Sequence, residues 1–155
     1  MSTRAELIAT YASAPDRLRA AVRELSEEQI AAPRDEGKWS VHQLCVHLAD
    51  SDLHGLLRIR RILAQPGSEL QTFDQDAWVE SLAGVTSTAA AVDAFALCRR
   101  MGTELFLAAW PESWRFIGRH PERGPMGLDA QLELLAWHGD HHIDQIVEFR
   151  RRMEW

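Results

Sequence analysis

Apolar residues recur along most of this chain at spacings that alternate between three and four, which is the period of one buried face of an α-helix. Four long stretches show the pattern, at about residues 7–25, 41–62, 91–109 and 128–153. No stretch has the two-residue alternation of a convincing β-strand. The sequence therefore predicts an all-α protein, built as a four-helix bundle in which amphipathic helices share one core.

Capping residues mark where two of these helices begin. Ser40 begins the second helix, with Gln43 three residues later in the capping-box position. The second helix should end before Pro66, and Ser87 or Thr88 should cap the third.

Proline interrupts the first predicted helix, and two short helices are predicted between the long ones. Pro15 interrupts the first apolar stripe and predicts a kink or break, because proline removes a backbone donor and disfavours helical geometry in the preceding residue. Short helical pieces are expected after Ser26 and from Asp76 to Leu82.

A long connection precedes the last helix. The segment from Pro111 to Gly127 holds three prolines and three glycines, and it is predicted to be irregular. Long loops are often functional, and this one could overhang the open end of the bundle. Trp114, Phe116 and His120 are its candidates for lining a pocket.

Size and charge limit the classes of function. The chain has 155 residues and is expected to form a single domain over 1–155. Its formal net charge of -6 and the lack of a basic cluster argue against nucleic acid or a membrane surface as partner. No apolar run predicts a signal peptide or membrane span, so a cytoplasmic protein is expected. Cys45 and Cys98 stand apart and predict buried, unreactive thiols.

The last helix carries the richest chemistry, because three histidines fall within five positions there. His138 and His142 are four residues apart, so their imidazoles lie on one helical face. His142 lies in the predicted buried seam and His138 on its edge. The seam comprises Leu128, Leu132, Leu135, Gly139, His142, Ile146, Phe149 and Met153. Buried imidazoles need a metal, a hydrogen bond or water.

A facing helix can supply the third ligand of a metal site. The second helix holds His42, His47 and His54, of which His47 borders the buried stripe, while His54 is an alternative and His42 faces elsewhere. A site of His47, His138 and His142 suits zinc, nickel or iron(II) and leaves positions open for water or substrate. Any single histidine pair is more often a hydrogen-bonded structural feature than a metal site.

Three further residues near the predicted site have several possible roles. Asp50 could ligate the metal, act as a base or orient His47, and the last role is the commonest for such carboxylates. Gln145 could bind metal-bound water or simply fill the end of the bundle. His141 turns away from His142 on the helix, and Asp144 offers it a surface partner.

Four segments together resemble the DinB-like superfamily, in particular its bacillithiol-transferase and metal-dependent hydrolase branch. They are Trp39-Ser40-Val41 with Gln43, His47-Leu48-Ala49-Asp50-Ser51, Phe73-Asp74-Gln75-Asp76-Ala77-Trp78, and Trp137-His138-Gly139-Asp140-His141-His142 with Gln145-Ile146. The resemblance implies an up-down-down-up four-helix bundle, usually a homodimer. It also implies a divalent metal, nickel or zinc before iron, manganese or cobalt, bound by His47, His138 and His142.

The resemblance implies an activity less sharply than a metal site. One hypothesis is an S-transferase that conjugates a small-molecule thiol to an electrophilic substrate, with Asp50 and Gln145 as candidate catalytic residues. A second is a hydrolase that uses metal-activated water. A third is a metal-stabilised stress protein without turnover. Asp140, where relatives often have a basic residue, and Asp144-Gln145, where they often have Ala-His, put the second substrate in question.

Overall fold

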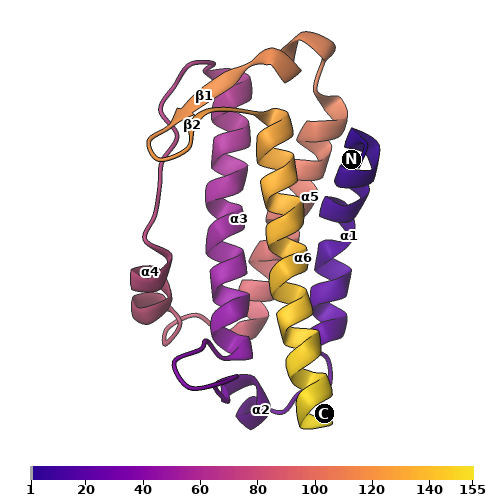
Figure 1. Ribbon diagram of the computed structural model, residues 1–155, viewed down its shortest axis with the longest axis vertical. Helices are drawn as coiled ribbons and strands as arrows, with labels where there is room; N and C mark the ends of the chain where they lie inside the picture. The colour runs from indigo at the N-terminus through magenta and orange to yellow at the C-terminus, as the bar shows by residue number, and fades with distance from the viewer. Residues whose placement is uncertain (1) are drawn as a thin grey trace.

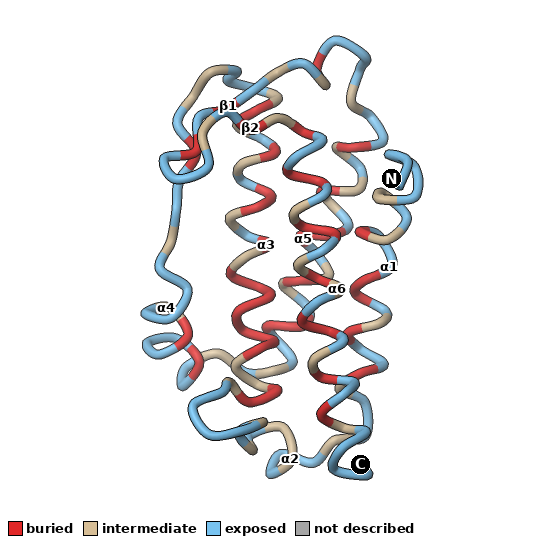
Figure 2. The backbone as a smooth tube through the Cα atoms, viewed as in Figure 1, coloured by how far each residue is buried: buried red, intermediate tan, exposed pale blue. Residues whose placement is uncertain are grey.

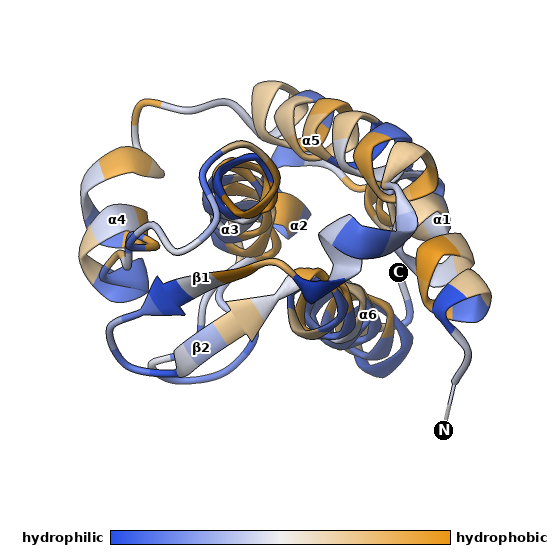
Figure 3. Ribbon diagram, turned by 90° about the horizontal axis from the view of Figure 1, so that it is seen from above, coloured by the Kyte–Doolittle hydropathy of each residue, from blue (hydrophilic) through white to orange (hydrophobic). Residues whose placement is uncertain are grey.

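The computed structural model describes residues 2–155 and confirms the four-helix bundle. The four long helices are α1 (Arg4–Val22), α3 (Val41–Ala64), α5 (Thr88–Ala108) and α6 (Leu128–Met153). Figure 1 shows that α3 and α5 run in one direction while α1 and α6 run in the other, which is the expected up-down-down-up topology. Seen from above, the helices surround one core, and the short helix α4 (Gln75–Leu82) lies outside α3 (Figure 3).

The predicted helix starts agree with the capping bonds. The hydroxyl of Ser40 accepts from the backbone N–H of Gln43, and the Gln43 side chain accepts from the backbone N–H of Ser40. Ser26 caps the short helix α2 (Glu27–Ala31) in the same way, and Ser87 caps α5. Each cap satisfies backbone donors that the first turn leaves without a partner.

Pro15 does not break the first helix, contrary to one of the two predicted outcomes. Proline cannot donate to the carbonyl four residues earlier, which here is that of Tyr11. A guanidinium nitrogen of Arg99 on α5 lies 3.5 Å from this carbonyl oxygen and donates to it. The helix therefore continues through Pro15 because a neighbouring helix supplies the missing hydrogen bond.

The prediction that the chain has no strands was wrong. After the 3-10 turn η1 (Pro111–Arg115), strands β1 (Ile117–His120) and β2 (Gly124–Gly127) form an antiparallel hairpin across one end of the bundle (Figure 1). Gly124 has a φ of 73°, which favours glycine at the end of so tight a turn. The segment after α3 joins the hairpin, because Leu70 donates to the carbonyl of Arg119.

A buried ion pair divides the core into two apolar parts. Nε of Arg99 on α5 lies 2.6 Å from a carboxylate oxygen of Asp52 on α3, and both side chains are fully buried. Arg99 also donates to the backbone carbonyl of Leu135 on α6, at 2.8 Å. We call the layer of Asp52, Arg99 and Gly139 the polar waist. A Cβ at Gly139 would lie 2.8 Å from a nitrogen of Arg99, so this glycine makes room for the guanidinium.

The apolar core lies in two parts, above and below the polar waist. Figure 2 shows buried residues along most of the length of α3. Leu44, Phe95 and Ile146 belong to the part nearer α2, and Ile59 and Leu132 belong to the part nearer the hairpin. The seam predicted on α6 is buried except at Met153, which is 46% exposed. No helix among residues 2–155 has the apolar length that crossing a bilayer requires.

Replacing Gly102 by alanine is expected to destabilise the fold by about 1–3 kcal/mol, because a Cβ at this position would overlap the hydroxyl of buried Tyr11. The measurement is urea unfolding of the purified variant. Gly84→Ala is the matched control, since a Cβ there meets no atom within 4 Å. Equal midpoints for the two variants would show that Tyr11 moves aside at no cost.

Candidate metal centre

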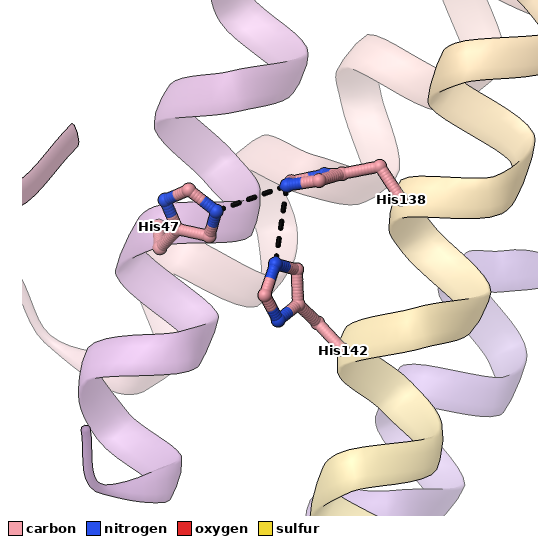
Figure 4. A group of neighbouring side chains, drawn as sticks. All are labelled: His47, His138 and His142. Atoms are coloured by element: carbon pink, nitrogen blue, oxygen red, sulfur yellow. Dashed lines mark hydrogen bonds between the residues drawn. The ribbon is translucent and has the colours of Figure 1, made fainter. Parts of the chain in front are cut away.

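Helices α3 and α6 bring three imidazoles together. His47 comes from α3, and His138 and His142 come from successive turns of α6 (Figure 4). Nε2 of His138 lies 3.0 Å from Nε2 of His47 and 3.1 Å from Nε2 of His142. The sequence prediction of these three as one cluster is therefore met by the geometry, and no other such metal-ligand cluster occurs among the described residues.

Neighbouring side chains orient two of the rings. Nδ1–H of His142 donates to the side-chain oxygen of Gln145 at 3.0 Å, which leaves the lone pair of its Nε2 directed at the cluster. The indole of Trp39 lies against the ring of His47, with ring centres 4.8 Å apart. Gln145 thus positions a histidine of the cluster, a role that the sequence analysis did not assign to it.

Burial keeps the three imidazoles neutral. Burial is the largest cause of pKa values of about 4 for His47, about 4 for His142 and about 2 for His138, and neighbouring histidines contribute to all three shifts. Neutral rings offer lone pairs at pH 7. Nitrogens about 2.0–2.1 Å from one ion, at angles of roughly 90–109°, would lie roughly 2.9–3.4 Å apart, and the separations of His138 from His47 and from His142 match this range. The donor set therefore fits one divalent transition metal.

The metal-free protein is expected to lose stability as the pH falls from about 7 to 5. The unfolded chain protonates each histidine near pH 6.5, whereas the folded pKa values are lowered, so the unfolded state binds more protons in this range. The loss should approach a limit of about 1.4 kcal/mol per pH unit for each histidine as the pH falls below about 6. Urea unfolding in chelator measures the slope. His138→Asn should reduce this slope, and a slope equal to that of the wild-type protein would contradict the assignment.

A cleft of about 440 Å³ gives access to the cluster. His138 and His142 line it together with Trp39 and Trp137, and it runs along the groove between α3 and α6 toward the hairpin. Of the loop residues predicted to line a pocket, His120 does so. Trp114 and Phe116 instead pack on the part of the core nearer the hairpin.

The other candidate histidines lie outside the cluster. His42 contacts the hydroxyl of Thr88 and the carbonyl of Ala83, as expected for a residue that faces elsewhere. His54, the alternative ligand, stacks on Phe73 with ring centres 4.2 Å apart and is not part of the cluster.

His141 has a different partner from the one predicted. Its Nε2 accepts from the side-chain nitrogen of Gln145, and its ring stacks on Trp137. Asp144 instead forms an ion pair with Arg17 of α1, which also contacts Asp140. Asp140 and Asp144, at which this chain departs from the family pattern that it resembles, therefore both contact Arg17.

Asp50 lies beside the cluster without joining it. Its carboxylate is not among the clustered ligand atoms, and neither its Oδ2 nor Nδ1 of His47 has a hydrogen-bond partner in residues 2–155. The predicted orienting bond between these two residues is therefore not formed. Burial raises the pKa of Asp50, while His54 opposes this shift.

Several residues of the cleft were not predicted from the sequence. Arg58, Phe73, Glu122 and Arg123 line it, and they come from α3, the loop that follows α3 and the hairpin turn. The segment from Phe73 to Trp78 was recognised as a motif in the sequence. No local sequence pattern indicated that Arg58 and Arg123 lie close together. The cysteines are free and buried as predicted, and burial raises the pKa of Cys45 to about 12.

Comparisons with known proteins give consistent results. The model of the DinB superfamily matches residues 10–146. A Bacillus licheniformis protein named "Putative metal-dependent hydrolase" is 35% identical over 148 residues, covering 92% of this chain and 82% of that protein. A Bacillus cereus protein of the same name is 26% identical over 141 residues, which cover 91% and 82% of the two chains.

Two solved structures share the fold. YfiT from Bacillus subtilis, described as "a probable metal-dependent hydrolase with an unusual four-helix bundle topology", superimposes with a TM-score of 0.92 at 25% identity, covering 100% of this chain and 91% of YfiT. The four-helix bundle protein TT2238 gives a TM-score of 0.67 at 20% identity over 92% of this chain and 96% of its own.

Proposed function

This chain belongs to the DinB superfamily, and we propose that it is a metal-dependent S-transferase that joins a low-molecular-weight thiol to an electrophilic substrate. The observation that carries the proposal is the convergence of three neutral imidazoles, two of which, His138 and His142, line a cleft. Three protein ligands leave coordination positions for a substrate, whereas a structural site is usually closed by four.

The proposed ligands are His47, His138 and His142, and nickel or zinc is the proposed ion. When bound, the ion would lower the pKa of a thiol so that the thiolate predominates at neutral pH. Gln145 holds His142 in the tautomer that directs Nε2 at the cluster, and Trp39 restricts the ring of His47. These contacts position the ligands before substrate arrives.

The residues of the cleft favour a thiol over water as nucleophile. Glu122 is the only carboxylate that lines the described cleft, and it belongs to the hairpin turn rather than to the turns that carry the histidines. A free thiol has a pKa of about 8.5 and water one of 15.7, so a thiol needs a smaller pKa shift from the ion to ionise at neutral pH. In the transfer, sulfur releases its proton to solvent and bonds to the electrophilic atom, whose leaving group departs with its electron pair.

A hydrolase is the second candidate, and the names of the similar Bacillus proteins favour it. It would need a group in the cleft that accepts a proton from water. His141 is exposed there, with its Nε2 held by Gln145. Asp50, proposed from the sequence as a catalytic residue, is not among the residues that line the cleft.

The remaining proposals concern the surroundings of the protein. We propose that the chain acts in the cytoplasm and, from the family resemblance, that it forms a homodimer. Its net charge of -6 supports small molecules as partners, rather than nucleic acid or a membrane.

Adding a thiol to the cobalt-substituted protein is expected to produce a sulfur-to-metal charge-transfer band, because the proposed centre keeps a position for sulfur. Absorption spectroscopy detects the band, and monochlorobimane reports transfer of the thiol to an electrophile. His47→Ala should remove both the band and the turnover. His54→Ala should keep both, since its ring stacks on Phe73 outside the cluster.

A spectrum that no thiol changes would contradict the transferase. Cleavage of an ester or amide by the same preparation, lost in His47→Ala, would then favour the hydrolase. Neither reaction, together with a full complement of metal, would favour the non-catalytic protein.

A further inference from the structure

Three basic side chains meet where the cleft reaches the hairpin. Arg58 belongs to α3, eleven residues beyond His47 and therefore about 16 Å further along the helix axis. His120 ends β1, and Arg123 lies in the turn before β2. All three line the same cleft as His138 and His142.

Local hydrogen bonds hold two of these side chains in place. Nε and Nη2 of Arg58 donate to the backbone carbonyl of Gln71, at 3.0 and 2.6 Å. Nδ1 of His120 accepts from the backbone N–H groups of Glu122 and Arg123, both at 3.3 Å. The neutral imidazole must therefore carry its proton on Nε2, where it is a donor.

These contacts leave donors unused. Nη1 of Arg58 and Nε2 of His120 have no hydrogen-bond partner in the described chain, and the guanidinium group of Arg123 forms neither a hydrogen bond nor an ion pair there. The hydrogen bonds to Gln71 account for part of the role of Arg58, because they hold the loop in place. They do not account for the position of Arg123. The free donors are of the type that binds an anion.

The local charge is unbalanced. Burial lowers the pKa of half-buried Arg58, and the charge of Arg123 adds to this shift. Burial also lowers the pKa of His120, with Arg58 and then Arg123 adding to the shift, whereas Glu122 opposes the shifts of both groups. The groups are therefore close enough to repel one another. One carboxylate faces two guanidinium groups, in a protein whose overall charge is -6. A bound anion would relieve this repulsion.

We propose that Arg58, His120 and Arg123 form an anion-binding subsite, which holds a carboxylate or phosphate group of a substrate whose reactive atom lies at the histidine cluster. The planar guanidinium fork matches both kinds of anion. The identity of the ligand as a substrate rests on the proposed function. The distance along α3 indicates an elongated molecule, longer than a thiol of two or three carbons.

The first test compares glutathione with its diethyl ester, which have the same sulfur but differ in their carboxylate charges. Titration of the cobalt-substituted protein should give an affinity for glutathione at least about tenfold higher, the effect of one hydrogen bond between charged groups. Arg123→Gln and Arg58→Gln should remove this preference and change ester binding by less than about twofold. Arg100→Gln, an exposed arginine on α5, should keep it.

Arg123→Gln is the decisive variant, because Arg123 is exposed and its loss leaves no buried group without a partner. Arg58→Lys accompanies Arg58→Gln, since it keeps the charge if the loop at Gln71 shifts. An equal affinity of wild-type protein for acid and ester, or a preference that survives in Arg123→Gln, overturns the proposal.

A second test determines whether the anion-binding subsite exists even if the protein does not transfer a thiol. If no thiol changes the cobalt spectrum, the metal-free protein is titrated with succinate and with inorganic phosphate by calorimetry. Binding of either anion that is lost in Arg123→Gln supports the subsite while the transferase fails, and the anion that binds identifies the chemistry. Absence of binding by both anions overturns the subsite as well.

Discussion

Alanine at both His138 and His142 is expected to abolish stoichiometric binding of a divalent transition metal, from about one ion per chain to none. The double variant leaves His47 as the sole imidazole of the cluster. Zinc binding by four protein ligands is worth roughly 10–16 kcal/mol, so the loss of two ligands should cost about 10⁴-fold or more in affinity. Elemental analysis of purified protein measures the outcome.

His54→Ala is the matched control, because this histidine is also on α3 but stacks on Phe73 outside the cluster. It should retain full occupancy. Chelation should lower the melting temperature of wild-type protein and of this control, but not of the double variant, because the ion binds only the folded chain. Full occupancy in the double variant would rule out these ligands.

Replacing Arg99 by methionine is expected to destabilise the protein by about 3–5 kcal/mol, the largest effect on folding that we predict. The change leaves the fully buried carboxylate of Asp52 without its cation. It also leaves the carbonyls of Tyr11 and Leu135 without a donor that Arg99 now provides. Urea unfolding followed by circular dichroism gives the change in free energy.

Two further variants identify the cause of this loss. Arg100→Met, next to Arg99 but exposed, should change stability by less than about 0.5 kcal/mol. Adding Asp52→Leu to Arg99→Met should recover part of the loss, because an apolar pair needs no compensating charge. A double variant less stable than Arg99→Met would show that Asp52 stabilises the fold by itself.

The helices and the histidine cluster were predictable because both depend on local spacing. Ser40 and Gln43 form a cap within four residues, and His138 and His142 share a face through the helical period alone. His47 could be chosen because it borders an apolar stripe. Each of these inferences needs only a short window of sequence and the assumption that apolar faces meet.

The features that were predicted wrongly or not at all depend on contacts between residues far apart in the sequence. Pro15 is tolerated because Arg99, 84 positions later, donates to the carbonyl that proline leaves free. The hairpin has strands of only four residues each, containing glycine and proline, so no alternation is visible. Arg58 and Arg123 meet because the hairpin folds back beside α3, and no local pattern records that contact.

The polar waist has a consequence for the alignment of the helices along their axes. Helices that contact one another only through apolar seams can shift along their axes, because one leucine can take the packing position of another. A slide of α6 by one turn, about 5.4 Å, would replace the Leu135 carbonyl beside Arg99 with the carbonyl of another residue. It would also bring a residue with a side chain to the place of Gly139. The waist thus sets the register in which His138 stands opposite His47, so the spacing of the cluster is determined by a layer that contains none of its ligands.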